Sequence, residues 1–549
     1  MRLPCSFARG SGASGRVRSV ALTPRYNASF APRSTWPASG FSMTSSSSRR
    51  PAAPSRDRRP GQGARKPGTA AGRQSVHLSP DSLGFALDQA AQAVGAVRAG
   101  AALPAALTSV FAALPPDLVP LARGAVQDIA YRTMRRLGLV DWLIKQRVSK
   151  APPPPVANLI ACSLALLVDD EADAAYAPFT VVDQAVRAIG ARRDLAFAKG
   201  LVNAVLRGFL REREAALAAA QANEVARWNY PQWWIDATRT AWPDQWPAIL
   251  AAGNTHGPLT LRVNARRTTA VEYLKRLQAA NIDAVQIGEH AVRLAAPLPV
   301  DRIPGFMAGD VSVQDAGAQI AAECLDVRDG MRVLDACAAP GGKSGHLLEL
   351  ADIDLIALES DATRARRIDE NFERLGFAQP DPAHPMRSAR VVTGDAGDPA
   401  AWYDGQPFDR ILADVPCSAS GIVRRHPDIR WLRRQSDIAS LAKEQRRIVD
   451  ALWALLKPGG ELLYVTCSIF PQEGEEAARW FESSRPDAVR LDAPGQLLPT
   501  AGGAPGGEAD NGAASKAQPD AAPDDAGSTA DPSRTADHDG FFYARFQKR

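Results

Sequence analysis

Cysteine is scarce in this sequence, and the few cysteines are scattered. The 549 residues contain six, at positions 5, 162, 324, 337, 417 and 467, and no two of them form a Cys-x-x-Cys pair. This spacing argues against a disulfide framework and against a structural zinc site. We therefore expect a protein of a reducing compartment that holds no metal.

Long apolar runs are also missing. No run reaches the roughly 18 residues needed to cross a bilayer, and the N-terminus lacks the continuous apolar segment of a secretory signal. We expect a cytoplasmic protein without membrane contact, and a monomer. The length of 549 residues and the hydrophobic content of 45% predict several globular domains.

Acidic residues are nearly absent from residues 1–74, where thirteen Arg and Lys66 face only Asp57. The segment is rich in Ser, Pro and Gly and poor in large apolar residues, so we expect a disordered basic arm. It could bind RNA through phosphate contacts. A solvated extension, upstream sequence translated before Met43 and an organellar transit peptide are the alternatives.

The remaining chain changes its pattern twice. Residues 75–222 repeat apolar positions at three- and four-residue intervals, which predicts an all-α domain whose first helix is capped by Ser79. Residues 223–310 mix short strands with a helix and predict a small α+β module. In residues 311–549 strands and helices alternate, as in a doubly wound, mostly parallel sheet. A Gly- and Asp-rich stretch at about 495–540 is expected to be a disordered insertion, and the final "FFYARFQKR" an antiparallel strand of the same sheet.

Polar groups gather after the predicted strands of the last domain. Ligands of such sheets bind at the carboxyl ends of the strands. Cys417 follows "RILADVP" and Cys467 follows "ELLYVT", so the two thiols can share one site. The turn "DACAAPGGKS" has neither the GxGxxG nor the GxxxxGK[ST] spacing, but Gly341 and Gly342 permit close approach of a flat ligand. Glu359 is placed to accept hydrogen bonds from ribose hydroxyls, and Asp395 is expected to lie near an adenine.

Three long motifs carry a family resemblance: "DACAAPGGKS", "DVPCSASGIVRRHPDIRW" and "YVTCSIFPQEGEE". They resemble the S-adenosylmethionine-dependent RNA 5-methylcytosine methyltransferases. The helical region with "FAKGLVNAVLRGF" is similar to the NusB-like RNA-binding domain of the bacterial 16S rRNA cytosine-C5 methyltransferases, the Fmu/Sun/RsmB type. The resemblance implies a Rossmann-like methyltransferase domain after an all-α NusB-like domain and a small α+β module, with RNA, and specifically 16S rRNA, as the expected partner.

The resemblance also implies site residues. Cys467 would be the nucleophile, Cys417 would act in product release, and Asp414 would be catalytic as well as cofactor-binding. S-adenosylmethionine would be bound by Asp414, by the glycine-rich turn and by two acids that end other predicted strands. The residues of the turn are Cys337, Ala338, Ala339, Pro340, Gly341, Gly342 and Lys343, and the two acids are Glu359 and Asp395. This chain has Glu359 where relatives often have Asp, and Val-Pro-Cys where they often have Ala-Pro-Cys. Neither difference removes a carboxylate or a thiol.

The chemistry explains why a thiol is needed. Carbon 5 of cytosine is a poor nucleophile, so a thiolate must first add to carbon 6, and carbon 5 of the resulting enamine then attacks the methyl group. Asp414 is placed to hydrogen-bond the cytosine edge and to favour the protonated ring, which predicts a general acid-base contribution of roughly 100-fold or more.

Basic residues near Cys417 are the candidates for RNA contact. "RRHPDIRW" directly follows the Pro-Cys pair and offers Arg424, Arg425 and Arg430 to phosphates around a base withdrawn from its stack. Arg262 and Asn264 lie nearby in the arrangement of the family. Arg132, Arg135 and Arg136 could form a basic face of the helical domain, or simply face water.

Three other functions stay open. A non-catalytic NusB-like RNA-binding factor would keep the fold without the chemistry, but the intact cysteines speak against it. A 5-methylcytosine methyltransferase of another RNA, such as tRNA, would share every motif. Methylation of an exocyclic amine typically uses an (Asp/Asn)-Pro-Pro-aromatic site without a thiol, and "DVPC" stands in its place here.

Overall fold

The computed structural model describes residues 78–169, 174–500 and 537–549, all within one compact unit of the chain. The basic arm expected at 1–74 and most of the insertion expected at about 495–540 therefore lie outside the described residues. None of the helices in the described ranges is both long and apolar enough to span a membrane.

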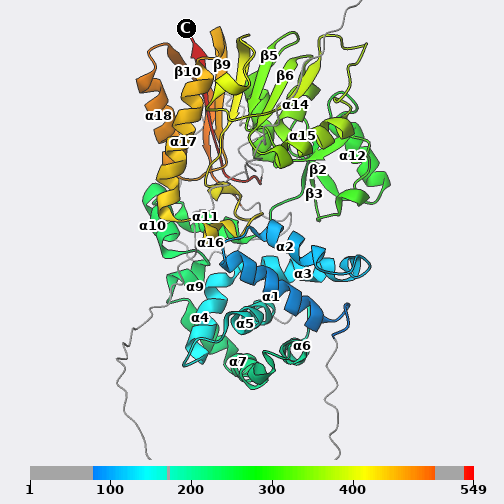
Figure 1. Ribbon diagram of the computed structural model, residues 1–549, viewed down its shortest axis with the longest axis vertical. Helices are drawn as coiled ribbons and strands as arrows, with labels where there is room; N and C mark the ends of the chain where they lie inside the picture. Colours follow the sequence, from blue (N-terminus) through cyan, green and yellow to red (C-terminus); the bar gives the residue numbers. More distant parts are fainter. Residues whose placement is uncertain (1–77, 170–173, 501–536) are drawn as a thin grey trace, which may run out of the picture. The chain divides into compact units, whose positions relative to one another are not determined.

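The first part is helical up to Ala220, as predicted for residues 75–222, and three more helices follow in the stretch that was assigned to the α+β module (Figure 1). The first helix begins after Ser82, whose hydroxyl accepts a hydrogen bond from the Phe85 amide. The predicted cap, Ser79, is therefore wrong by three residues, and the Ser79 carbonyl instead accepts the Ser82 hydroxyl. The helices of this part are α1 (Leu83–Arg98), α2 (Leu103–Ala112), α3 (Val119–Arg135), α4 (Leu137–Arg147), α5 (Pro154–Leu167), α6 (Pro178–Ala191), α7 (Lys199–Arg211), α8 (Arg213–Ala220), α9 (Glu224–Trp228), α10 (Gln232–Ala241) and α11 (Trp246–Asn254).

A small antiparallel sheet follows, with strand order β2-β3-β1-β4. Its last strand pairs with its first, although the expected boundary at 310 assigned that strand to the catalytic domain. The strand has only three residues, too few for an alternating pattern to reveal it. The elements are β1 (Thr260–Val263), α12 (Ala270–Ala279), β2 (Ala284–Gln286), β3 (Ala291–Leu294) and β4 (Val311–Val313).

The third part is built on a seven-stranded sheet of order β10-β11-β9-β8-β5-β6-β7. The strands β9, β8, β5, β6 and β7 are parallel to one another. Of these, β8, β5 and β6 are buried on both faces, which explains their continuous apolar runs. The strands are β5 (Arg332–Ala336), β6 (Asp354–Glu359), β7 (Ser388–Thr393), β8 (Phe408–Asp414), β9 (Leu456–Thr466), β10 (Ala488–Leu497) and β11 (Phe541–Lys548).

Helices cover both faces of this sheet and form two apolar cores with it. One core includes side chains of α17 and α18, and the other side chains of α13, α14 and α15. The predicted Rossmann-like architecture is confirmed. The helices are α13 (Ala316–Leu325), α14 (Gly342–Leu350), α15 (Ala362–Leu375), α16 (Ile429–Leu432), α17 (Gln435–Trp453) and α18 (Glu475–Ser484).

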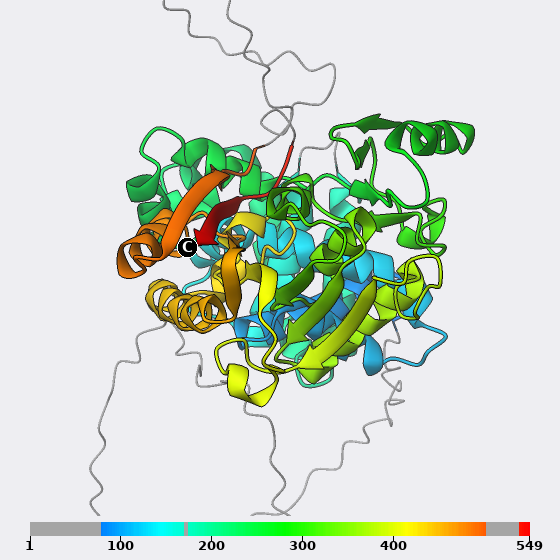
Figure 2. The same ribbon diagram turned by 90° about the horizontal axis from the view of Figure 1, so that it is seen from above.

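The C-terminal strand returns to the sheet, as predicted. β11 pairs antiparallel with both β9 and β10 and lies between them (Figure 2). Its first residue, Phe541, pairs with Leu497 at the end of β10. The insertion was expected to begin at about 495, but residues up to Leu497 belong to this strand pair, so that expectation is wrong by a few residues.

Candidate active site

Two cysteines meet where neighbouring strands end. Cys417 follows β8 and Cys467 follows β9, and these strands are parallel with Asp414 opposite Val465. The two Sγ atoms lie 3.3 Å apart, within hydrogen-bonding distance. The prediction that both thiols share one site is confirmed, and both are free cysteines that are partly exposed.

The two sulfurs are not equivalent. The hydrogen bond to Cys467, together with burial, raises the pKa of Cys417 well above its ordinary value, and the charges of Cys467 and Glu473 add to this. The raised pKa favours the protonated form of Cys417, whose S–H can donate to the sulfur of Cys467.

A lysine-aspartate pair lies beside the thiols. Lys343, in the first turn of α14, is 2.7 Å through its Nζ from Oδ2 of Asp414, the last residue of β8. Burial opposes the charge of Lys343, but the Asp414 carboxylate outweighs it and raises the pKa of Lys343, with a smaller contribution from Cys467. The structure thus brings a cation, a carboxylate and two thiols together at the ends of adjacent strands.

The glycine-rich turn from Cys337 to Gly342 connects β5 to α14. Gly341 has a φ of +92°, and a Cβ there would lie 3.3 Å from the Cα of Ile368, so a side chain would be strained. The carbonyl oxygens of Ala339 and Pro340 accept hydrogen bonds from Arg364 and Asn371 of α15. The turn is therefore held firmly, with its backbone close to any ligand at this edge.

Glu359 ends β6 next to the turn and is only 2% exposed. Its Oε1 accepts the Asp361 amide at 3.0 Å, while its Oε2 is buried without a hydrogen-bond donor and has only the Arg364 guanidinium 3.3 Å away. A buried carboxylate oxygen that lacks a donor fits the vicinal hydroxyls of a ribose. The residues present thus fit the nucleoside part of S-adenosylmethionine.

Asp395 stands apart from these groups. It lies two residues after β7, its side chain is half exposed, and both carboxylate oxygens are 2.9 Å from Arg447 of α17. Burial acts against its charge, yet the bond to Arg447 lowers the pKa of Asp395. Its proposed contact with an adenine remains a prediction.

One buried acid at this site was not among the predicted residues. Asp335 in β5 is 1% exposed, accepts the Ser344 hydroxyl with one oxygen and has no partner for the other. Burial raises the pKa of Asp335 to about 7, against the lowering effect of the Ser344 bond. Its place inside the glycine-rich motif was the only sequence signal for it.

A buried polar network lies behind the cysteines and was also missed. Glu473 is fully buried, and its Oε1 accepts the Ser418 amide at 2.8 Å and the Gln445 side chain at 3.1 Å. Its Oε2 accepts the Ser468 hydroxyl at 2.7 Å. Ser418 directly follows Cys417 and Ser468 directly follows Cys467, so one carboxylate joins the two loops that carry the thiols.

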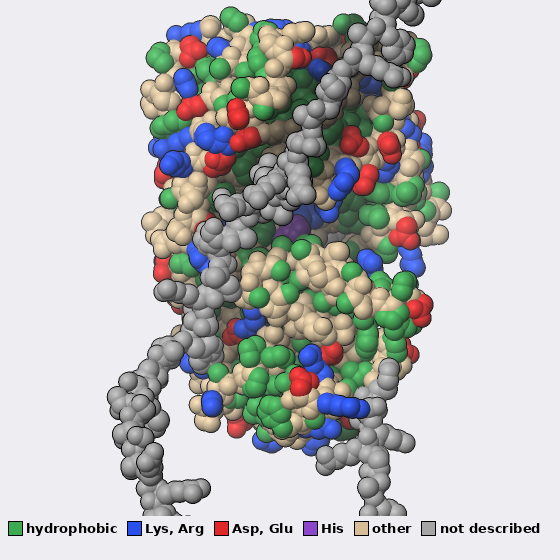
Figure 3. Space-filling view, viewed as in Figure 1, with side chains coloured by type: hydrophobic (Ala, Val, Ile, Leu, Met, Phe, Trp, Pro, Cys, Tyr) green, Lys and Arg blue, Asp and Glu red, His purple; other side chains and the backbone are tan. Residues whose placement is uncertain are grey.

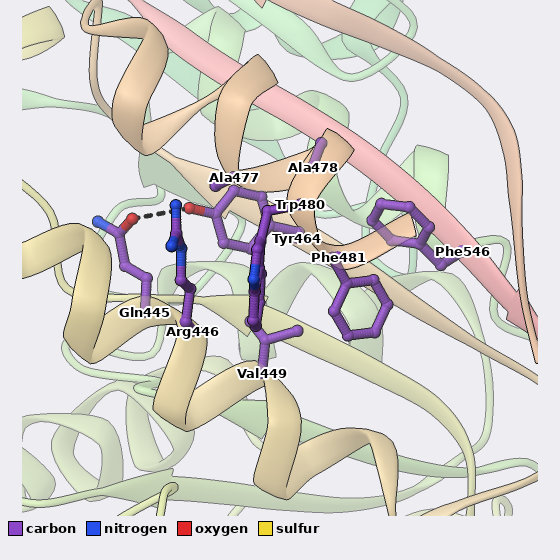
Figure 4. A pocket seen from close by; sticks show the side chains of 9 residues that line it. All are labelled: Gln445, Arg446, Val449, Tyr464, Ala477, Ala478, Trp480, Phe481 and Phe546. Atoms are coloured by element: carbon purple, nitrogen blue, oxygen red, sulfur yellow. Dashed lines mark hydrogen bonds between the residues drawn. The ribbon is translucent and has the colours of Figure 1, made fainter. Parts of the chain in front are cut away.

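The network extends into the helices that cover the sheet. Figure 4 shows Gln445 of α17 joined to the hydroxyl of Tyr464 in β9 by a hydrogen bond of 2.9 Å. The cavity that these side chains line together with apolar groups of α18 measures about 10 Å³. A single water needs roughly that much space, so the cavity is a packing gap and not a ligand site.

The residues predicted to contact RNA are largely buried, and that contact stays a prediction. Arg262, Asn264, Arg424 and Arg430 are each at most 1% exposed, and only Arg425 is partly exposed. Their distant partners could not be read from the sequence. A direct contact with RNA would require these four side chains to break their hydrogen bonds within the protein.

Their bonds are internal. Arg262 pairs with Glu349 and donates to the Gly342 carbonyl, so it supports the glycine-rich turn. Asn264 donates to the Gly309 carbonyl. Arg430 donates to the Gly253 carbonyl at 2.6 Å and lies over the Tyr230 ring.

Arg424 and Arg425 hold the entry to β11. Both pair with Asp539, and Arg425 also pairs with Asp315. Over the face shown in Figure 3, basic and acidic side chains alternate and do not gather in one basic area. The described residues also contain no group of His, Cys, Asp and Glu that could hold a metal ion.

Comparisons with known proteins identify the family of the chain. The family model described as 16S rRNA methyltransferase RsmB/F matches residues 322–547, and the RsmF/B-like ferredoxin-like domain model matches residues 230–301. The chain is 38% identical over 472 residues to ribosomal RNA small subunit methyltransferase B of Pseudomonas syringae pv. tomato, covering 84% of this chain and 96% of that protein.

A second relative and one solved structure extend the comparison. The protein of the same name from Pseudomonas putida is 40% identical over 415 residues, which cover 73% of this chain and 90% of the relative. The crystal structure of PH0851 superposes with a TM-score of 0.62 at 23% identity, over 86% of this chain and all of that one. This structural likeness supports the fold alone.

Proposed function

The chain belongs to the 16S rRNA methyltransferase RsmB/F family, and on this premise we propose that it methylates carbon 5 of a cytosine in 16S rRNA through a transient bond to Cys467. Membership makes it an S-adenosylmethionine-dependent RNA methyltransferase. The position on the base and the covalent step are our proposal. They are supported by the 3.3 Å approach of the two thiols beside the Lys343–Asp414 pair.

S-adenosylmethionine, when bound, supplies an electrophilic methyl group. The turn from Cys337 to Lys343 and Glu359 would hold it, because they offer a close backbone and a buried acceptor for ribose hydroxyls. Asp335, before the turn, accepts a hydrogen bond from Ser344, after the turn, and so holds the two ends of the turn together.

The chain's own residues would act on the base in sequence. The Cys467 sulfur bonds to carbon 6 as a thiolate, and the electrons of the double bond between carbons 5 and 6 shift into the ring. Ring nitrogen 3 takes up the proton that Cys467 has given up, with Asp414 hydrogen-bonded to that edge of the ring. Carbon 5 then accepts the methyl group. A base removes the proton of carbon 5, the double bond between carbons 5 and 6 re-forms, and the bond to the Cys467 sulfur breaks.

Cys417 fits the last of these steps. It keeps its proton, and its sulfur lies 3.3 Å from that of Cys467. Its S–H can therefore stabilise the sulfur of Cys467 as this sulfur leaves carbon 6. Without that donor the adduct would break down slowly, and enzyme bound to RNA would accumulate.

Two variants test the proposal in reducing buffer. Cys467→Ser should abolish transfer of tritiated methyl groups to a 16S rRNA transcript, whereas Cys417→Ala, which removes the donor, should give a protein–RNA band that survives denaturing electrophoresis. Cys324→Ser is the matched control, because this thiol lies on α13 among apolar side chains of the core. Nucleoside analysis of the product should yield 5-methylcytosine. A Cys467→Ser enzyme with wild-type transfer would refute the covalent step, and a tRNA transcript methylated in preference to rRNA would refute the substrate.

A further inference from the structure

A second polar site lies between the helical part and the loop that follows Cys417. It is a cavity of about 290 Å³, far larger than the roughly 10–15 Å³ needed for one water. Its lining consists of basic and amide side chains from the end of α3 and from the segments after α9 and α11, and contains no acid: Arg132, Arg135, Arg136, Asn229, Asn254 and His256.

Arg135 is the least satisfied of these groups. Among the described residues no carboxylate lies within salt-bridge distance of it, and its one hydrogen bond, of 2.9 Å, goes to the Arg424 carbonyl. Its Nε is buried without a partner. Burial and the nearby Arg430 lower the pKa of Arg135 to about 10. A desolvated cation beside other cations is unfavourable unless an anion joins it.

The two neighbouring arginines are neutralised by two carboxylates. Arg132 pairs with Asp128 and Asp169, and Arg136 also pairs with Asp169. Two guanidinium groups thus share one of the two carboxylates. Arg135 therefore gives the described lining a positive excess that faces the cavity.

The segment that follows Cys417 connects the cavity with the proposed active site. The lining of the cavity is bonded to the loop that begins at Cys417: Arg135 contacts the Arg424 carbonyl, and Asn254 accepts a hydrogen bond of 2.5 Å from Arg430. Farther along the same loop, Arg433 donates to the Cys417 carbonyl at 3.2 Å. A ligand held here would touch the segment that positions one of the two thiols.

We propose that this cavity binds a backbone phosphate of the RNA strand whose cytosine enters the active site. The inference rests on the proposed function and adds a contact to it. Guanidinium groups suit phosphate because they offer several N–H donors in a planar fork. The Nδ2 of Asn229 and the ring of His256 add polar groups for the adjoining sugar, whereas the Asn254 amide already bonds to Arg430 and to the Trp228 carbonyl.

Salt dependence of RNA binding tests the proposal, because each phosphate contact adds about 0.7 to 0.9 to the slope of log affinity against log salt. Arg135→Gln should weaken binding of a 16S rRNA transcript roughly tenfold and lower that slope by about one contact. Arg135→Lys should keep the slope, because it keeps the charge. Arg123→Gln is the matched control: it lies on the same helix, is exposed, and contacts Phe111 outside the cavity.

A second variant avoids the internal bond of Arg135. His256 is exposed at the rim of the cavity, and its side chain makes no hydrogen bond within the described structure. His256→Glu should weaken RNA binding by repulsion, whereas His256→Gln should not. Thermal melting of each variant checks that the fold is retained.

The outcomes separate this proposal from the proposed function. A slope that is unchanged in Arg135→Gln would overturn the cavity assignment, even if affinity falls, because it would indicate a loosened loop. An Arg135→Gln variant with weaker binding of inorganic phosphate but normal binding of RNA would overturn the assignment to RNA. A wild-type protein that binds rRNA with the expected salt dependence and transfers no methyl group would overturn the proposed function alone.

Discussion

Glu473→Gln changes one atom behind the two cysteines and should affect both stability and rate. The carboxylate accepts three hydrogen bonds, from the Ser418 amide, the Gln445 side chain and the Ser468 hydroxyl. A glutamine keeps the shape and removes the charge. The nitrogen of the introduced amide is a donor, whereas the carboxylate oxygen it replaces was an acceptor. It therefore faces a group that donated a hydrogen bond to Glu473.

The magnitude follows from these contacts. Hydrogen bonds to a charged group contribute about 1.5–3 kcal/mol each and neutral ones about 1 kcal/mol. If the side-chain oxygen of the introduced glutamine keeps the bonds of Ser418 and Gln445, each is weakened by about 0.5–1 kcal/mol. The bond from Ser468 must reverse within a group of hydroxyls that already bond to one another, which costs about 1–2 kcal/mol. The free energy of unfolding should therefore fall by about 2–4 kcal/mol.

The rate should fall because the two thiol-bearing loops lose their common acceptor. A misplacement of about 1 Å in an active site costs on the order of 100-fold in rate. Single-turnover methyl transfer, at saturating S-adenosylmethionine and rRNA, measures this. Affinity for S-adenosylmethionine should not change, because Glu473 makes no bond to the glycine-rich turn or to Glu359.

Glu476→Gln is the matched control for this experiment. Glu476 lies three residues later, is exposed and makes no ion pair within the described residues. The control should keep wild-type stability and rate. A Glu473→Gln enzyme that transfers methyl groups at the wild-type rate would refute the idea that this carboxylate holds the thiols in position.

Two further predictions concern buried acids at the strand ends. The folded protein raises the pKa of Asp335 from 3.8 to about 7, so its stabilising effect is complete below about pH 3.8 and is lost as the pH rises to about 7. Asp335→Asn should remove this part of the pH dependence in denaturant unfolding, and a variant with the wild-type pH slope would contradict the assignment. Glu359→Gln should weaken binding of S-adenosylmethionine about tenfold by calorimetry, while the exposed Glu370→Gln on α15 should not; equal affinities in the two variants would argue against ribose recognition by Glu359.

The sequence predicted those parts of the fold and site that depend on local patterns. Continuous apolar runs identified the parallel strands, because both faces of that sheet are buried. The position of Cys417 and Cys467 after such runs was enough to place the thiols together, since adjacent parallel strands end at the same edge. The strand pattern of Phe541–Lys548 predicted its return to the sheet, because an apolar strand needs a partner.

The arginines could not be predicted in the same way. Charge favours the surface unless a partner is present, and the partners lie far away in sequence: Glu349 is 87 residues from Arg262, and Asp539 is 115 residues from Arg424. The Glu473 network was hidden for a similar reason. An acid six residues after Cys467 resembles a solvent-exposed turn until Ser418, fifty-five residues earlier, is seen to donate to it.

The tertiary bonds around the thiols explain why the last strand belongs to the site. The Gly421 amide donates to the Cys467 carbonyl, and the Gly540 amide donates to the Gly421 carbonyl, each at 2.9 Å. A Cβ on Gly421 would lie 2.1 Å from the Gly540 carbonyl oxygen, so the two segments touch at the closest distance that glycine allows. Gly421, in the loop after Cys417, is thus hydrogen-bonded both to Cys467 and to Gly540 at the entry to β11. Because β11 pairs with β9, which ends at Thr466 just before Cys467, pairing of the C-terminal strand fixes the same two loops that the Glu473 carboxylate joins.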